Sequence, residues 1–229
     1  MWYLDVIHFA AFFGLVNYVS TNTIKFLLKN IKINEKEYIL VKVGEKCAST
    51  IHSTIAVYLA VNILMNDYIW SNRISFISKE SILLSHFTCG YFLYDVVLCL
   101  ARYKDIGPVF CGHAILAFVI NSISILSGVG HFYTASFIIW ETSTPFVNIR
   151  YFMNKLRISR FENIINASIL LTFLIFRIIW GSYIYYIIVL DTIYLSEGLL
   201  LKIPVFIAFL MNAMNYYWFY KMVNIAIKL

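Results

Sequence analysis

The sequence predicts an all-α, polytopic membrane protein with about seven transmembrane helices. Hydrophobic residues make up 61% of the 229 residues and charged residues only 13%, whereas about 25% of a typical soluble domain is charged. The mean hydropathy is +0.78. Apolar stretches of about 20 residues, long enough to cross a bilayer as helices, recur along the whole chain. These features exclude a water-soluble globule.

The apolar stretches predict helices in a defined order along the chain. They lie near residues 2–26, 47–66, 81–101, 106–127, 130–152, 163–190 and 199–224. The boundary between the fourth and fifth is the least defined, because only residues 128–130 separate them. A single re-entrant hairpin there would reduce the count to six. Pro145 removes a backbone donor within the fifth stretch and is expected to kink it.

The basic residues give the predicted helices an orientation. With seven spans, fourteen lysines and arginines fall on one side of the membrane, while Arg177 lies inside a span. The other side carries Arg73, Lys79 and Lys202. Because cytosolic loops are enriched in basic residues, we expect a lumenal N-terminus and a cytosolic C-terminus. This bias accounts for the net charge of +6, so no nucleic-acid partner is expected.

Five of the spans carry an ionisable residue well inside the apolar stretch. These residues are His52, Asp95, His113, Glu141 and Arg177. Insertion of a charged side chain at the bilayer centre costs roughly 2.5 to 3.5 kcal/mol, so each should face the bundle interior or an aqueous cavity. They are therefore the candidate site residues.

Helix geometry divides these residues into two groups. At 1.5 Å per residue, His52, Asp95 and His113 lie roughly 8 to 10 Å below the cytosolic boundary on three helices. Glu141 and Arg177 lie deeper, where an ion pair between them would offset the cost of burial. Two further residues, Asn148 and Asn215, lie near the cytosolic ends of their spans and are expected to join the polar layer. The carbonyl of Glu141, freed by Pro145, needs a donor such as Thr142, Thr144 or Arg177.

Histidine and aspartate at one level suggest a specific chemistry. A histidine near neutral pKa can act as base or nucleophile, and a hydrogen-bonded aspartate fixes its tautomer. Such a site near the cytosol, under an apolar cavity, suits acyl transfer from a donor with a soluble head and a fatty tail, such as acyl-CoA. The alternative is that His52 and His113 only hydrogen-bond between helices. No metal and no resident cofactor are expected.

Local sequences resemble a known family. In chain order they are STIHS (49–53), GYFLYD (90–95), GHAILAF (112–118), ETSTPFVNIRYF (141–152), FRI (176–178) and NAMNYYW (212–218). Together they resemble the TLC domain family over about 180 residues, from near Lys42 to near Lys221. The most specific part is the run of Glu141, Pro145, Asn148 and Arg150. We therefore expect an N-terminal transmembrane helix and basic cytosolic loop over residues 1–41 and a TLC domain over 42–224.

The resemblance implies a helical barrel around a lipid cavity, in the endoplasmic reticulum or Golgi. The family includes ceramide synthases, which acylate sphingoid bases of sphingolipid metabolism from acyl-CoA. By this resemblance Asp95 matches the family aspartate, His52 the histidine of the STxHS segment, and His113 the second member of a His-His pair. Gly112 stands where the first histidine of that pair is expected, which counts against ceramide-synthase activity.

Three functions therefore remain open. The first is binding or handling of membrane lipids or acyl chains in membrane lipid homeostasis. The second is acyl-CoA-dependent N-acylation of a sphingoid base or another amine lipid, with His113 as base or nucleophile, Asp95 orienting it and His52 as a second base. For either function, Glu141, Asn148, Arg150, Arg177 and Asn215 form the lipid-binding or structural polar core. The third is a trafficking or translocation accessory, for which the sequence identifies no protein partner.

Overall fold

The computed structural model describes residues 2–27, 36–195 and 199–227, so residues 28–35 of the expected basic loop lie outside the described residues. Residues 36–41, also expected in that loop, belong instead to the second helix, which begins at Lys36. Every regular element within these ranges is helical. The elements are α1 (Trp2–Leu27), α2 (Lys36–Leu64), α3 (Asp67–Ser71), α4 (Lys79–Ala101), α5 (Tyr103–Ile106), α6 (Pro108–Ser127), α7 (His131–Ile138), the 3-10 helix η1 (Ile139–Ser143), α8 (Thr144–Leu156), α9 (Glu162–Thr172), the π-helix η2 (Phe173–Ile179), α10 (Trp180–Leu195) and α11 (Leu199–Ile227).

Five stretches of the described chain are helices long and apolar enough to cross a membrane. They are Trp2–Leu27, Lys42–Leu64, Lys79–Ala101, Pro108–Ser127 and Glu162–Tyr194. The predicted all-α membrane fold is thus confirmed. The count of seven is not, because the expected fifth span is divided into α7, η1 and α8, and α11 is not among the five.

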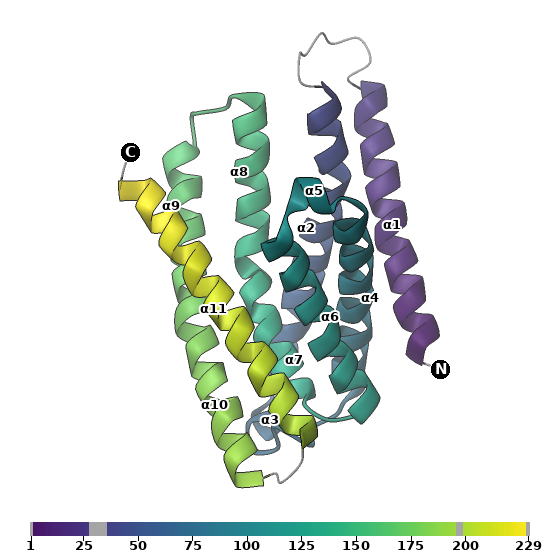
Figure 1. Ribbon diagram of the computed structural model, residues 1–229, viewed down its shortest axis with the longest axis vertical. Coiled ribbons are helices and arrows are strands. Elements are labelled where there is room, and N and C mark those ends of the chain that lie inside the picture. The colour runs from purple at the N-terminus through teal and green to yellow at the C-terminus, as the bar shows by residue number, and fades with distance from the viewer. Residues whose placement is uncertain (1, 28–35, 196–198, 228–229) are drawn as a thin grey trace.

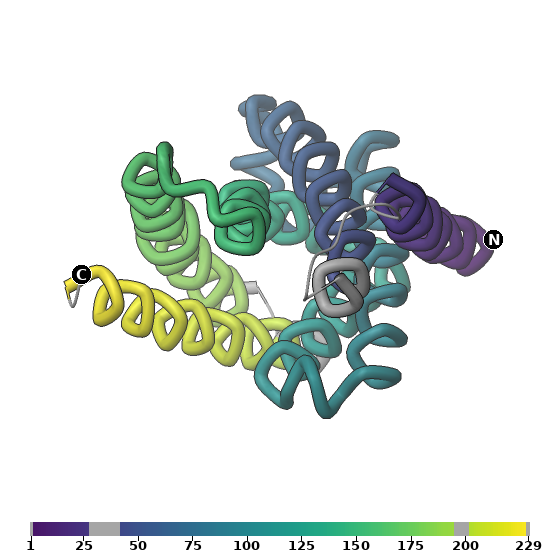
Figure 2. The backbone as a smooth tube through the Cα atoms, turned by 90° about the horizontal axis from the view of Figure 1, so that it is seen from above, coloured from purple at the N-terminus to yellow at the C-terminus, as the bar shows by residue number. Residues whose placement is uncertain are grey.

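The helices run along the long axis of the molecule (Figure 1). One end carries α5, the α8–α9 turn and the C-terminal end of α11, and we call it the basic end. The opposite end carries the start of α1, α3, the α6–α7 turn, the C-terminal end of α10 and the start of α11 (Figure 1). Seen from above, α1, α2, α4 and α6 form one group, α8, α9 and α10 another, and α11 bridges the two (Figure 2).

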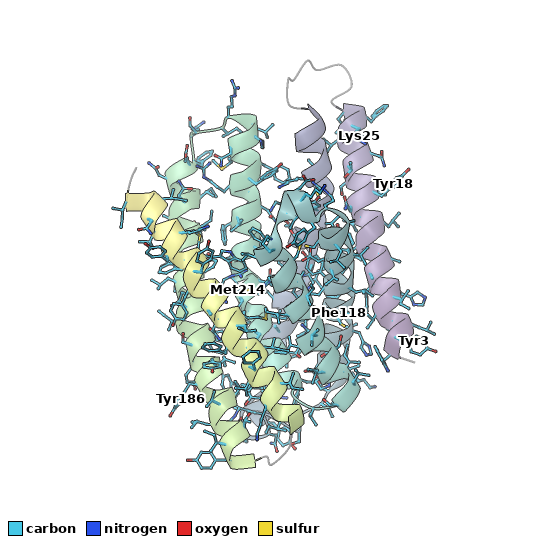
Figure 3. The ribbon with its side chains drawn as sticks, in the orientation of Figure 1. Tyr3, Tyr18, Lys25, Phe118, Tyr186 and Met214 are labelled. Carbon is cyan, nitrogen blue, oxygen red and sulfur yellow. The ribbon has the colours of Figure 1, made fainter. Side chains whose placement is uncertain are left out.

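Large apolar and aromatic side chains cover the outside of the bundle, as expected for a surface in contact with lipid. Tyr3 and Tyr18 project outward from α1 and Tyr186 from α10 (Figure 3). Tyr18 is 69% exposed and Tyr186 60% exposed. The inside is instead packed closely: a Cβ added to Gly90 of α4 would lie 2.8 Å from the carbonyl oxygen of Val6 in α1.

Two irregular helical segments contact each other in the middle of the bundle. Pro145 lies in the first turn of α8, directly after η1, so the expected kink is a short 3-10 turn. The Glu141 carbonyl accepts the backbone N–H of Thr144, one of the donors expected from the sequence. The π-helix η2 packs against η1 and carries Arg177. π-helical turns are frequent at functional sites.

A tight turn joins α6 and α7 at the opposite end. Gly128 and Gly130 both adopt positive φ angles, 66° and 77°, which glycine accepts without steric cost. The Gly130 N–H donates to the Ile74 carbonyl at 2.8 Å. The turn is therefore fixed to the loop that precedes α4.

Candidate functional site

A cavity of about 420 Å³ lies between α6, α7, η1, α10 and α11. Its wall follows α6 from His113 to Ser127. These residues are fourteen positions apart, which corresponds to about 21 Å along a helix. Most of the wall is apolar and includes Phe92, Ala117 and Met211. The cavity is thus long, and most of it suits hydrocarbon.

His113 and Glu141 both line this cavity. The Thr144 hydroxyl donates to Glu141 Oε2 at 2.5 Å, and Arg177 Nη2 lies 3.6 Å from Glu141 Oε1. The structure therefore contains the ion pair between Glu141 and Arg177 expected from the sequence. Electrostatic interactions also link His113 to Glu141 and Arg177.

Arg177 is 7% exposed, and its guanidinium donates to side chains of other elements. Its Nε donates to Ser143 Oγ at 2.9 Å, and its Nη1 donates to Asn215 Oδ1 at 3.2 Å. Asn215 thus lies in the polar core, as the sequence suggested. These contacts fix the guanidinium and through it the Glu141 carboxylate.

His52 is fully buried but does not line the cavity. Its ring stacks on Tyr91 at 3.9 Å between centroids and 6° between planes. The Phe92 ring lies 5.6 Å from His52 and 6.1 Å from His113, between centroids. Neither ring nitrogen of His52 has a hydrogen-bond partner among the described residues. Contact between the two histidines therefore runs through Phe92.

Asp95 is not joined to either histidine by a hydrogen bond in the described part of the chain. Its electrostatic partners are Glu141 and Lys46. The structure therefore does not bring His52, Asp95 and His113 together as one acid–base group. Phe92, which lies three residues before Asp95 and therefore on the same face of α4, is the residue whose ring contacts both histidines. Of the two carboxylates among the described residues that line the cavity, Glu141 and Asp191, Glu141 is the one with an electrostatic interaction with His113.

The predicted residues Asn148 and Arg150 connect helices instead of lining the cavity. Asn148 Nδ2 donates to Ser49 Oγ at 2.7 Å and to Thr50 Oγ1 at 2.8 Å, which fastens α8 to α2. Arg150 Nε donates to Asn166 Oδ1 at 2.7 Å, which fastens α8 to α9. Both contacts hold the position of α8. They thereby also hold the 3-10 helix η1, which directly precedes α8 and carries Glu141.

A further ionic cluster lies at the opposite end of the cavity and was not predicted. Arg73 Nε and Nη2 donate to the two oxygens of Asp191, each at 2.7 Å. Tyr133 also donates to Asp191, and both Tyr133 and Asp191 line the cavity. Hydrogen bonding to Asp191 raises the pKa of Arg73 above its already high value. The sequence feature that could have indicated this cluster is Arg73, the arginine on the side of the membrane predicted to carry few basic residues.

Comparisons with known proteins agree with this architecture. The family model of the TLC domain matches residues 42–224. Topoisomerase I damage affected protein 4 of Saccharomyces cerevisiae is 31% identical over 180 residues, which cover 69% of this chain and 60% of the relative. An uncharacterized TLC domain-containing protein of Schizosaccharomyces pombe is 30% identical over 142 residues, 60% of this chain and 49% of the relative. TLC domain-containing protein 4-B of Danio rerio is 32% identical over 83 residues, 35% of this chain and 31% of the relative. The chain thus spans a third to three fifths of these relatives.

Proposed function

The chain belongs to the TLC domain family of membrane proteins, and on this premise we propose that it binds acyl chains or whole lipids and contributes to membrane lipid homeostasis. The family resemblance favours the endoplasmic reticulum or Golgi membrane as its location. The basic end of the bundle would face the cytosol, because basic loops favour that side.

The apolar cavity is the observation that carries the proposal. It measures about 21 Å along α6, whereas one leaflet contributes about 15 Å of the roughly 30 Å hydrocarbon core. A fatty chain that fills one leaflet therefore fits within it. Ligand cavities of this kind are mostly apolar, with a few polar groups that fix orientation. His113 and Glu141 supply such groups at one end.

A blocked cavity tests the proposal. Ala208 of α11 is 1% exposed and lines the cavity, so Ala208→Phe fills it. Ala213 on the same helix is exposed, and Ala213→Phe is the matched control. The protein extracted and purified in detergent, without added lipid, should release copurified lipid that mass spectrometry identifies, and Ala208→Phe should lose that lipid while Ala213→Phe retains it. Equal lipid in all three samples, or none in the wild type, would contradict lipid binding in the cavity.

A second candidate function is acyl-CoA-dependent N-acylation of an amine lipid such as a sphingoid base. The observation in its favour is that His113 and Glu141 face one cavity. His113 would accept a proton from the amine as the nitrogen attacks the thioester carbonyl, and Glu141 would stabilise the imidazolium. The carbon–sulfur bond then breaks, coenzyme A leaves as the thiolate and takes up the proton, and an amide remains.

Labelled acyl-CoA separates the two functions. Wild-type protein incubated with labelled acyl-CoA and several amine lipids should form a labelled amide, and His113→Ala should abolish the product. His8 is exposed on α1, so His8→Ala is the control and should leave turnover unchanged. Absence of any amide would refute the enzymatic function and would leave the lipid retention measured above as the test of the first.

A further inference from the structure

The cavity has a second polar region about 12 Å from His113, toward the opposite end. Asn121 lies eight residues after His113 on α6, and helix geometry gives the distance. Ser124 follows one turn later on the same helix, and Thr134 faces it from α7. All three line the cavity. They are 6%, 8% and 7% exposed, respectively.

Asn121 contributes a hydrogen-bond acceptor without a partner. Its Nδ2 donates to the Ala117 carbonyl at 2.8 Å. Since only the NH₂ group can donate to a carbonyl, this bond fixes which way the amide is turned. Asn121 Oδ1 then has no donor among the described residues. A buried acceptor without a donor is unfavourable, so its retention beside a cavity indicates a ligand that supplies the donor.

Ser124 adds a donor to the same region. Thr134 Oγ1 donates to Ser124 Oγ at 3.1 Å. The hydrogen of the Ser124 hydroxyl is then free to point to a ligand oxygen, because a hydroxyl both donates and accepts. A group that donates to Asn121 and accepts from Ser124 would satisfy both side chains.

The charges at this end of the cavity favour a neutral ligand group. Asp191 is the carboxylate among the described lining residues here, and both of its oxygens are bonded to Arg73. A ligand ammonium would therefore find no free negative charge. A carboxylate or phosphate would bring further acceptors to the Asn121 acceptor. A hydroxyl group meets the requirement, since it both donates and accepts without charge.

We propose that Asn121, Ser124 and Thr134 form a subsite for the hydroxyl group of a lipid alcohol, whose hydrocarbon runs along the apolar wall toward His113. The inference rests on the proposed lipid-binding function. It adds that the ligand is recognised at a second point, by a neutral hydroxyl in the half of the cavity away from His113. The hydroxyl lies about 9 Å from the end of α6, six residues before Ser127.

The test measures binding of tritiated hexadecanol to the full chain in nanodiscs, with hexadecane and palmitate as competitors. Asn121→Leu removes the acceptor and keeps the size of the side chain. Loss of a buried hydrogen bond of this kind should weaken hexadecanol binding about tenfold and leave hexadecane competition unchanged. Asn62 makes the same bond from Nδ2 to a carbonyl four residues earlier, at 2.9 Å, on the exposed face of α2. Asn62→Leu is therefore the control and should bind as the wild type does.

Thermal unfolding separates recognition from a structural role. If Asn121 serves the ligand, Asn121→Leu without added alcohol should melt at the wild-type temperature or above it, because the unpaired acceptor is gone. A structural role predicts a lower melting temperature and unaltered hexadecanol affinity. Should Asn121→Leu not fold, Ser124→Ala provides the same test, with an expected loss of about threefold.

Two negative results have different meanings. Equal affinity for hexadecanol and hexadecane, or wild-type hexadecanol affinity in Asn121→Leu or Ser124→Ala, would overturn the hydroxyl subsite. The lipid lost by Ala208→Phe would then still support the cavity as a lipid site. If no lipid is retained by the wild type and none of the three probes binds, the lipid-binding function itself fails.

Discussion

Replacement of Arg177 by methionine should strongly destabilise the protein, because it leaves Glu141 as an unpaired buried carboxylate. Arg177 donates to Ser143 and Asn215 and lies 3.6 Å from Glu141. The side chains of Arg177 and Glu141 are only 8% and 13% exposed, so solvent screens them little. Removal of one partner from a buried ion pair costs about 3 to 5 kcal/mol. The Thr144 hydroxyl, which remains bonded to Glu141, places the expected loss toward the lower value.

Thermal unfolding in nanodiscs, followed by tryptophan fluorescence, measures this loss. For a chain of this size, Arg177→Met should melt roughly 10 °C below the wild type. The double variant Arg177→Met with Glu141→Gln removes both charges and should recover at least half of that difference, because neutral replacement of a buried pair is often tolerated. Equal melting of the single and double variants would show that the Glu141 charge is not the source of the loss. A wild-type melting temperature for Arg177→Met would refute the whole account of the pair.

Three further substitutions test other parts of the fold. Arg73→Ala should cost about 1 to 2 kcal/mol, since Arg73 is a third exposed. The raised pKa of Arg73 keeps its contribution complete at every pH below the already high pKa of an arginine in the unfolded chain, so unfolding should show the same loss at about pH 6 and about pH 9. Gly90→Ala should cost about 1 to 3 kcal/mol, because its Cβ meets the α1 backbone, and unchanged melting would contradict the close contact. Gly112→His should fold and retain lipid as the wild type does, since a Cβ there has no neighbour within 4 Å, and a large loss in melting temperature would show that the position is not open.

The sequence predicted what depends on length, hydropathy and the cost of burying charge. Apolar stretches long enough to span a bilayer placed α1, α4 and α6 well. The pair of Glu141 and Arg177 followed because two opposite charges deep in an apolar chain are costly unless they meet. The helix positions and this ion pair both depend only on depth in the membrane, which can be counted in residues along a helix.

Side-chain contacts within one level of the bundle could not be predicted in the same way. His52, Asp95 and His113 were predicted at one depth, yet the Phe92 ring contacts both histidines and no hydrogen bond joins Asp95 to either in the described chain. The contact between Arg73 and Asp191 was missed for a related reason, since it joins a loop to a helix 118 positions later. Both arrangements depend on how whole helices pack, which hydropathy and segment length do not reveal.

Gly112 departs from the family pattern at a position where packing does not require glycine. The resemblance to the family places a histidine there, and the structure gives that position open space, so packing does not require glycine. The difference from the family pattern therefore bears on chemistry alone. His113 remains at the cavity wall and faces the same space as Glu141, whereas the usual partner of its pair is missing. The apolar cavity and the buried ion pair support the proposed lipid-binding function, whereas one of the two histidines expected for acyl transfer is absent. For that reason the lipid-binding function takes precedence over the enzymatic one.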